Sequence, residues 1–235
     1  MREKMLQIIE EARADGRSVL FEHESKRVCE LVQLPVTTFR VAETIEEIVE
    51  ASQKIGYPVV LKVISRDITH KTEAGGVLLN LMDRDQVEHG FWQVKANVQK
   101  YDPKARVDGF LVQEMVPPST EVVIGMTKDA TFGPALMFGL GGIFVEILED
   151  IAFRIAPLSL SDAYEMIQEI KAYKILTGVR GRAPADIDAL VDILRKVSDL
   201  VIDFPEISQL DLNPVIVYPK GAKIVDARMI LEDAQ

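Results

Sequence analysis

A lysine and a histidine close together in the sequence are the first candidates for chemistry. Lys62 lies in the apolar run 59–64 ("VVLKVI"), and His70 follows it, ahead of the glycine pair 75–76. Lysine is almost never fully buried without a partner, so Lys62 either extends to solvent at a sheet edge or faces an anion. For His70 three interpretations are open: a solvated surface histidine, a general base, or a nucleophile that accepts a phosphoryl group.

The segment from Ser65 to Gly76 is too long for a tight hairpin, and the glycine pair allows its backbone to approach a ligand closely. We expect a flexible loop that can fold over phosphate groups. The segment matches neither the Walker pattern nor GxGxxG, so no motif specifies its ligand. Alternation along the preceding strand places Lys62 on the same face as Val60 and Ile64.

A carboxamide and a carboxylate near the C-terminus form a possible metal site. If "YPKG" (218–221) is a four-residue loop, the same hairpin register places Asn213 opposite Asp226. Cross-strand neighbours have Cβ atoms about 5 Å apart, and Mg²⁺ takes one or two protein oxygens alongside waters or phosphates. Asp211, on the face of Asn213, is a possible additional ligand. The alternatives are an ordinary polar cross-strand pair or an irregularity of the strand at Asn-Pro.

Two further carboxylates flank a proline-stiffened segment in "LVQEMVPPSTEVVIG" (111–125). Glu114 ends an apolar strand, and free backbone C=O and N–H groups of the connection that follows are possible partners for an adenine edge. Glu121 begins the next strand and is a possible acceptor for ribose hydroxyls. The alternative is a pair of solvated strand-end carboxylates.

The glycine-rich segment "FGLGGIFVE" (138–146), with Gly139, Gly141 and Gly142, is either a phosphate or partner contact or only a wide turn, and we assign it no role. Arg154 lies on a strand pattern and either faces an anion or pairs with one of the many carboxylates.

Hydrophobic periodicity and turn residues predict two α+β lobes around a shared cleft, over residues 1–108 and 109–235. Whether the first helix packs on the second lobe is left open. Thr44 with Glu47 predicts a capping box, and Asp83 predicts a helix N-cap. The expected helices cover 4–14, 21–33, 44–56, 83–101, a segment from about 161, and 185–204. The expected strands cover 36–42, 59–64, 76–82, 109–116, 121–128, 133–140, 146–158, 209–218 and 223–231.

Composition narrows the class of protein. The chain has 235 residues, a formal net charge of −10 and 27% charged residues. The net charge argues against general nucleic-acid binding, although a local site can still be basic. Cys29 is the only cysteine, so no internal disulfide can form, and no apolar run is long enough to span a membrane. The charged N-terminus does not resemble a signal peptide, and we expect a cytoplasmic protein.

Together these segments resemble the ATP-grasp fold as it is arranged in the β subunits of ADP-forming acyl-CoA synthetases. The resemblance lies in "YPVVLKVISRDITHKTEAGGV", "LVQEMV...EVVIG", "FGLGGIFVEILEDIAFRIAPL" and "LDLNPVIV...IVDAR", and it covers nearly the whole chain in order. The small archaeal-type β subunits of the acetyl-CoA group are most similar, and the succinyl-CoA synthetase β subunits are more distant.

The resemblance implies a role for each matching position. Lys62 resembles the strand lysine that contacts ATP phosphates. The segment from Glu114 to Val116 resembles the hinge between the lobes that binds adenine through its backbone, and Glu121 resembles the carboxylate that contacts ribose. Asn213 and Asp226 resemble the Mg²⁺ ligands.

His70 resembles the β-subunit histidine that is transiently phosphorylated in the acetyl-CoA group, since the succinyl type lacks a histidine in this loop. The family implies an α subunit that carries the CoA site and a catalytic histidine, in an α2β2 heterotetramer. The chain is then expected to pass a phosphoryl group through His70 to ADP and Mg²⁺, making ATP. Two alternatives are an ATP-grasp carboxylate–amine ligase, which needs no phosphohistidine, and a nucleotide-sensing regulatory module without turnover.

Overall fold

The computed structural model describes residues 1–68, 70–142, 149–179 and 183–232. The chain forms two compact units. Residues 37–117 form one, called the small unit here, and residues 1–36 together with 118–235 form the other, called the large unit.

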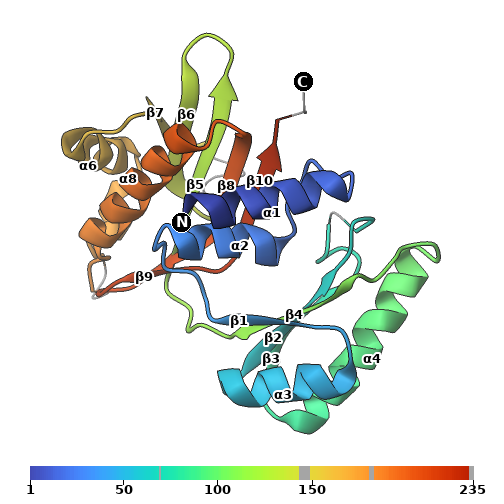
Figure 1. Ribbon diagram of the computed structural model, residues 1–235. Coiled ribbons are helices and arrows are strands. Elements are labelled where there is room, and N and C mark those ends of the chain that lie inside the picture. The colour runs from blue at the N-terminus through green and yellow to red at the C-terminus, as the bar shows by residue number, and fades with distance from the viewer. Residues whose placement is uncertain (69, 143–148, 180–182, 233–235) are drawn as a thin grey trace. The chain divides into compact units, whose positions relative to one another are not determined.

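The small unit is an antiparallel sheet with two helices packed on one face (Figure 1). Its strand order is β1-β4-β2-β3. The strands are β1 (Phe39–Ala42), β2 (Val59–Ile64), β3 (Val77–Leu81) and β4 (Gly109–Glu114), and the helices are α3 (Ile45–Ile55) and α4 (Arg84–Tyr101).

Both predicted helix caps of this unit are confirmed. The Thr44 hydroxyl accepts the Glu47 N–H at 3.3 Å, and the Glu47 carboxylate accepts the Thr44 N–H at 3.3 Å. The Asp83 carboxylate accepts the Gln86 N–H at 2.8 Å. Each bond satisfies a backbone donor that the first helical turn leaves unpaired, so these short side chains fix where α3 and α4 begin.

The two faces of β2 have different neighbours. Val59, Leu61 and Val63 belong to the hydrophobic core that α3 and α4 cover. Alternation therefore places Val60 and Lys62 on the opposite face, although every residue of β2 is buried. The predicted face of Lys62 is confirmed.

The unit boundaries differ from the expected division at residue 108. Strand β4 pairs with β1 and with β2, so its residues belong to the small unit, which continues to Pro117. Residues 1–36 belong to the large unit, because Met5, Ile9 and Val28 lie in that unit's core. Strand pairing and burial, rather than sequence order, set these boundaries.

The large unit contains a second antiparallel sheet, with strand order β10-β8-β5-β6-β7 and β9 paired with β8. Its strands are β5 (Thr120–Asp129), β6 (Gly133–Leu140), β7 (Ile151–Ile155), β8 (Ile207–Val217), β9 (Ala222–Ile224) and β10 (Ala227–Leu231). Its helices are α1 (Arg2–Ala14), α2 (Glu22–Leu31), α6 (Leu160–Glu169), α7 (Tyr173–Leu176) and α8 (Ile187–Asp203).

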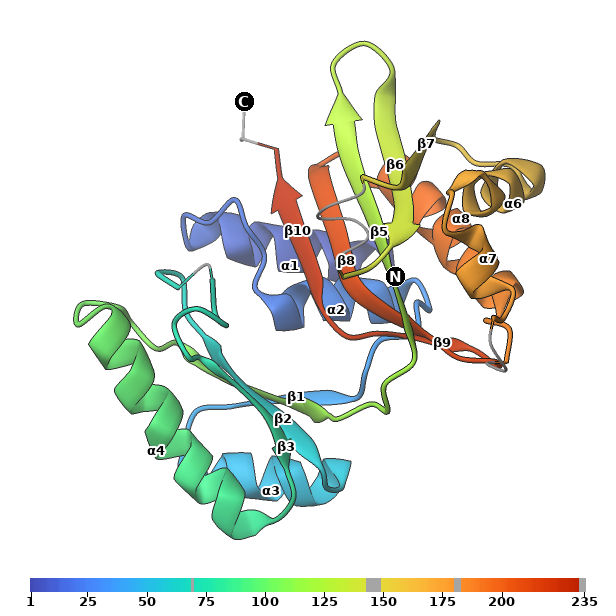
Figure 2. The ribbon, with the colours of Figure 1, turned by 180° about the vertical axis from the view of Figure 1, so that it is seen from behind.

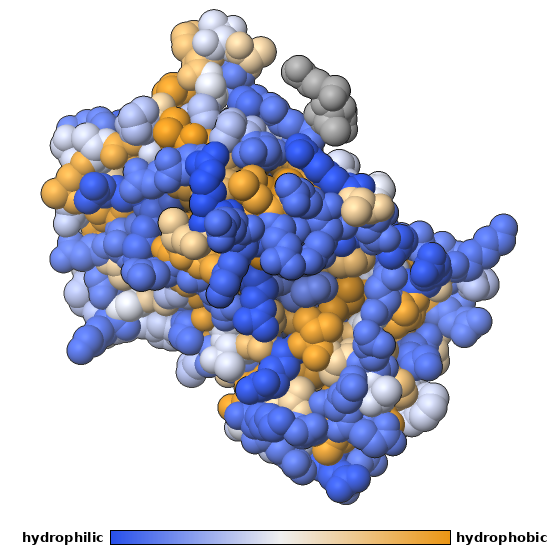
Figure 3. Space-filling model, viewed as in Figure 1, coloured by the Kyte–Doolittle hydropathy of each residue, from blue (hydrophilic) through white to orange (hydrophobic). Residues whose placement is uncertain are grey.

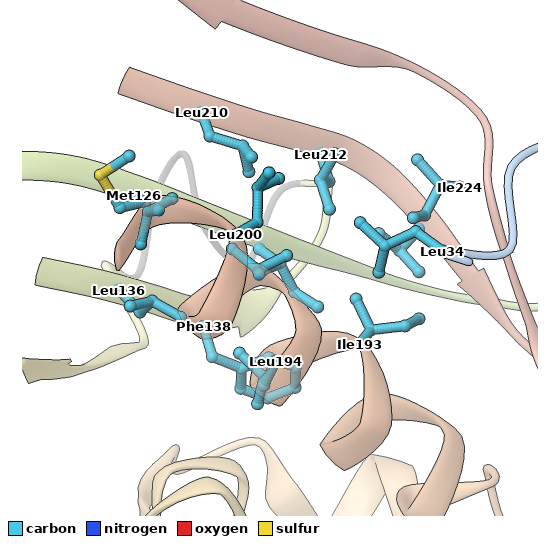
Figure 4. Close-up of a cluster of buried hydrophobic side chains, with 14 of the residues drawn as sticks. Leu34, Met126, Leu136, Phe138, Ile193, Leu194, Leu200, Leu210, Leu212 and Ile224 are labelled. Carbon is cyan, nitrogen blue, oxygen red and sulfur yellow. The ribbon is translucent and has the colours of Figure 1, made fainter. Parts of the chain in front are cut away.

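One hydrophobic core joins this sheet to its helices. Helices α1, α2 and α8 lie behind the sheet in Figure 2, and Figure 4 shows Leu194 of α8 beside Phe138 of β6. Alternate residues of the strands, such as Met126 and Leu212, point into this core. The intervening residues of β5, β8 and β10 therefore share the face of the sheet that lies away from α8.

The surface over α1 is mostly hydrophilic (Figure 3), as expected for an amphipathic helix with Met5 and Ile9 buried and Glu3 and Glu10 exposed. Among the described residues, no helix is long and apolar enough to cross a membrane.

Two predicted strands of this unit need refinement, and one helix was missed. The last predicted strand, 223–231, is divided into β9 and β10 by Val225 and Asp226. The short helix α7 was not predicted. Of the predicted strand 146–158, the structure forms β7 over residues 151–155, while residues 146–148 lie outside the described part of the chain.

Candidate functional site

His70 lies on the segment between β2 and β3, which we call the His70 loop (residues 65–68 and 70–76). Its side chain is 70% exposed, and its Nδ1 lies 3.9 Å from a carboxylate oxygen of Glu73. An imidazole in this position is open to a phosphoryl donor or acceptor from solution. The interpretation of His70 as a solvated surface histidine predicts the same exposure. The exposure of His70 alone therefore does not distinguish between the three interpretations.

The backbone around His70 forms a compact turn rather than a loose loop. The Ala74 N–H donates to the His70 carbonyl at 3.1 Å, and the Gly76 N–H donates to the Lys71 carbonyl at 2.7 Å. Ile68 and Ala74, on either side of His70, are each only 3% exposed and belong to the core of the small unit. The loop that we expected to be flexible is therefore anchored on both sides of an exposed histidine.

Lys62 lies beside the base of this loop. In register it is opposite Val77 of β3 and Leu111 of β4, and the next residue, Val63, donates its N–H to the Gly76 carbonyl at 2.8 Å. Strand β2 lies inside the sheet, between β3 and β4, and Lys62 is only 5% exposed. The interpretation of Lys62 as a sheet-edge lysine is therefore wrong, and the interpretation as a lysine that faces an anion remains.

Glu114 holds two strand ends together. Its carboxylate accepts the Thr38 N–H at 2.7 Å, its own N–H donates to the Thr38 carbonyl at 2.9 Å, and the Met115 N–H donates to the Pro58 carbonyl at 3.1 Å. Glu114 is half-buried, so it is not simply a solvated strand-end carboxylate. Val116, also half-buried, follows in the segment that leaves the small unit.

The predicted hairpin register is confirmed. Val217 pairs with Ala222, and two residues earlier Val215 pairs with Ile224. The Asn213 N–H then donates to the Asp226 carbonyl at 3.3 Å. Asn213 and Asp226 are therefore cross-strand neighbours on the sheet of the large unit.

A bulge occurs at this pair. On β5, Val122 pairs with Val215 and Ile124 pairs with Leu212, so Asn213 and Pro214 together lie opposite Val123. A bulge turns side chains away from the regular alternation, and bulges are frequent beside active sites. The strand irregularity and the polar pair, which the sequence offered as alternatives, are both present.

The electrostatics of this region favour a cation. The pKa of Asp211 is raised, first by loss of hydration and then by the negative charge of Asp226, while Arg228 lowers it. Arg228 lies opposite Asp211 in register. Two acidic groups that repel each other, on the hairpin that also carries Asn213, are oxygen donors of the kind that a hard divalent cation takes. Within the described residues no group of three or more His, Cys, Asp or Glu could hold a metal. A carboxamide and a carboxylate are oxygen donors of the kind that Mg²⁺ takes alongside waters or phosphates.

Glu121 is the second residue of β5 and is exposed. Its carbonyl accepts the Gly141 N–H at 2.7 Å, and a Cβ at Gly141 would lie 3.0 Å from the Glu121 Cβ. Gly141, to which the sequence assigned no role, thus permits close packing of the chain against Glu121. Arg154 pairs with Glu169 at 2.7 Å, as one of its two interpretations predicted.

Each unit thus brings part of the candidate set together. The small unit places Lys62 beside the base of the His70 loop, and the large unit makes Asn213 and Asp226 neighbours. Sequence reasoning did not find Asn97 of α4, whose side-chain amide donates to the Gly75 carbonyl at 3.0 Å. The only sequence indication was a polar amide inside a helix, one position before the buried Val98.

Comparison with known proteins gives similarity over nearly the whole chain. Residues 11–231 match the ATP-grasp domain family. The chain is 48% identical over 228 residues to the acetate–CoA ligase (ADP-forming) I β subunit of Pyrococcus furiosus, covering 97% of this chain and 98% of that one. It is 46% identical to acetate–CoA ligase (ADP-forming) I of Archaeoglobus fulgidus, covering 98% of this chain but only 33% of that longer protein.

Two solved structures of acetyl-coenzyme A synthetase 1 from Candidatus Korarchaeum cryptofilum are also similar, and each match covers 97% of this chain and 100% of the other. One, at 46% identity and a TM-score of 0.91, holds coenzyme A and acetyl-coenzyme A, with a phosphorylated phosphohistidine segment in a site I orientation. The other, at 44% identity and a TM-score of 0.87, holds coenzyme A and Mg-AMPPCP, with its phosphohistidine segment pointing towards the nucleotide-binding site.

Proposed function

Because this chain belongs to the ATP-grasp family, among the β subunits of ADP-forming acetate–CoA ligases, we propose that it is the nucleotide-binding subunit of an ADP-forming acyl-CoA synthetase. In this role it makes ATP from ADP and a phosphoryl group that comes from acyl-CoA and inorganic phosphate. The reaction is reversible.

Lys62 and the hairpin pair supply the charge that phosphates need. Lys62 contacts the phosphate oxygens from its buried position on β2. Asn213 and Asp226 hold Mg²⁺, which neutralises phosphate charge when it is bound. The backbone from Glu114 to Val116 contacts adenine, and Glu121 accepts hydrogen bonds from ribose.

His70 carries the phosphoryl group. In the partner subunit a histidine nitrogen attacks the phosphorus of an acyl phosphate, so that an N–P bond forms and the carboxylate leaves. An imidazole nitrogen of His70 then attacks the same phosphorus, so that a new N–P bond forms and the histidine of the partner subunit leaves. A terminal oxygen of ADP then attacks the same phosphorus, forming the O–P bond of ATP and releasing the imidazole. The observation that carries this role is that the core anchors the turn on both sides of His70 while the His70 side chain itself stays exposed. The two orientations of the phosphohistidine segment in the Korarchaeum enzyme support travel between two sites.

A partner must supply the rest of the enzyme. The Pyrococcus relative is a β subunit, and the Archaeoglobus relative is about three times as long as the matched region. We propose an α subunit that carries the CoA site and a second catalytic histidine, assembled with this chain as an α2β2 heterotetramer.

The test is to co-purify the chain with an α-type partner and to measure ATP formation from acetyl-CoA, ADP and phosphate. The proposal predicts ATP only when both subunits and Mg²⁺ are present. ATP-dependent ligation of an amine by the chain alone would instead identify a carboxylate–amine ligase. Nucleotide binding without any turnover in the complex would identify a regulatory module.

A further inference from the structure

Helix α4 contacts the His70 loop directly through one polar side chain. Asn97 lies one position before the buried Val98 and three after the buried Val94, so it borders the helix face that packs on the core. Its Nδ2 donates to the Gly75 carbonyl at 3.0 Å. Asparagine is a weak helix former, so this side chain costs α4 some stability that an alanine would not.

Gly75 and Asn97 fit each other closely. A Cβ added to Gly75 would lie 2.7 Å from the Asn97 Nδ2 and 3.0 Å from its Cγ. Gly75 also has a φ of +62°, which disfavours side chains. The backbone of the loop thus rests on the amide of Asn97, with no room for a side chain between them.

The other end of the loop has its own attachment. The Asp67 carboxylate accepts the Arg106 N–H at 2.8 Å, and the Asp67 N–H donates to the Ser65 hydroxyl at 3.1 Å. Ile68 follows, buried in the core. His70 thus lies between the two attachments, so a large displacement of His70 requires one of them to open.

The attachment through Asn97 is the weaker of the two. Strand pairing resumes at Gly76, whose carbonyl accepts the Val63 N–H at 2.8 Å. On the loop side of that bond the attachment consists of one neutral hydrogen bond and the small side chain of Ala74, whereas the other end buries the larger side chain of Ile68 and has the bond from Arg106 to Asp67. Opening at Gly75 therefore costs less free energy than opening at Ile68.

We propose that Asn97 is a positioning residue that fastens the Gly75 end of the His70 loop and thereby sets how often His70 leaves its docked position. The inference rests on the proposed relay through His70. Asn97 touches neither nucleotide nor phosphoryl group in this role. It acts by setting the fraction of molecules in which the His70 loop is released.

The first experiment is hydrogen–deuterium exchange of the full-length chain, wild type against Asn97→Ala. The amides of Ala74 and Gly76 report on the loop, since both donate within its turn. Loss of one neutral hydrogen bond predicts about five-fold faster exchange there, the equivalent of roughly 1 kcal/mol. Asn97→Asp keeps the shape but places a carboxylate against a carbonyl, so it should speed exchange further. Gln93→Ala, an exposed amide on the same helix, is the matched control and should change nothing.

The second experiment measures the two half-reactions separately in the complex with the partner subunit. These are phosphorylation of His70 from Mg-ATP and its phosphorylation from acetyl-CoA and phosphate. A five-fold larger population of the released His70 loop should speed, by up to five-fold, the half-reaction in which His70 must leave its docked position. The rate of the other half-reaction should stay within two-fold of the wild-type rate. General damage to the structure cannot produce a selective gain in rate.

Unchanged exchange in Asn97→Ala, or an equal change in both half-reactions, would overturn the positioning role. His70→Ala separates this result from failure of the relay. If His70→Ala still made ATP, the relay would be wrong, whereas the exchange measurement would still decide whether Asn97 fastens the loop.

Discussion

The His70 loop and the Asn213/Asp226 hairpin are both short polar segments beside strand ends, but they are fixed in different ways. The hairpin pair lies between two stretches of strand pairing, with β9 before Asp226 and β10 after it, and the bond from the Asn213 N–H to the Asp226 carbonyl joins the pair itself. His70 has no ladder partner, and its place depends on Ile68, Ala74 and the bond from Asn97. The difference matches the proposed tasks, because a metal ligand must stay in position and a phosphoryl carrier must be able to leave it.

The largest expected effect is a loss of catalytic rate, and it tests the Asn213/Asp226 hairpin. Asp226→Asn keeps the backbone carbonyl that accepts the Asn213 N–H, so the hairpin should fold normally. Replacing a charged metal ligand should lower kcat by about 100-fold and raise the Mg²⁺ concentration needed for half-maximal rate. Initial rates across a Mg²⁺ titration measure both, with the exposed Asp203→Asn as control. An unchanged Mg²⁺ dependence would remove Asp226 from the metal site.

Two glycine variants compare the base of the loop with the turn of the hairpin. A Cβ at Gly76 would lie 2.6 Å from Val63 Cγ1 and 3.1 Å from the Lys71 carbonyl, so Gly76→Ala should cost about 1–3 kcal/mol through overpacking. Gly221 has open space around it and a φ of +79°, so Gly221→Ala should cost about 1 kcal/mol, from backbone strain alone. Urea unfolding measures both. A larger cost at Gly221 would contradict the close packing at the base of the loop.

The smallest expected effect concerns the pH dependence of the hairpin turn. Asp186 accepts the Gly221 N–H at 2.7 Å and the Ala189 N–H at 3.0 Å, and these bonds lower its pKa, that to Gly221 most. A carboxyl whose pKa is lowered by folding stabilises the fold fully above its unfolded pKa of about 4, and this stabilisation is lost as pH falls through the folded value. Asp186→Asn should therefore cost about 1 kcal/mol at pH 7 and less below pH 4.

Urea unfolding of both proteins at pH 7 and pH 3 measures that difference. An equal cost at both pH values would show that the charge of Asp186 does not fasten the turn.

The hairpin could be predicted from the sequence because its register is a local property. The length of the loop "YPKG" determines which residues face each other across the hairpin. Alternation along the strands then determines which side chains share a face. The sequence offered an irregularity at Asn213 and Pro214 only as one alternative, because its form as a bulge depends on pairing with β5, a strand that is distant in sequence.

The anchoring of the His70 loop could not be predicted either. Burial of Ile68 and Ala74 depends on the packing of α4, and the bond from Asn97 joins residues 22 positions apart. The same limit applies to the unit boundaries, because the place of α1 and α2 in the large unit is decided by a sheet formed much later in the chain.

Mapping of the phosphorylated residue tests the central claim most directly. The chain contains three histidines, His23, His70 and His89, so each can be replaced by alanine in turn. The complex with its partner is incubated with γ-labelled ATP and Mg²⁺, and the acid-labile, base-stable label on this chain is measured. The proposed relay predicts label on wild type, His23→Ala and His89→Ala, and none on His70→Ala. Undiminished label on His70→Ala, or no label on any of the four proteins, would contradict it.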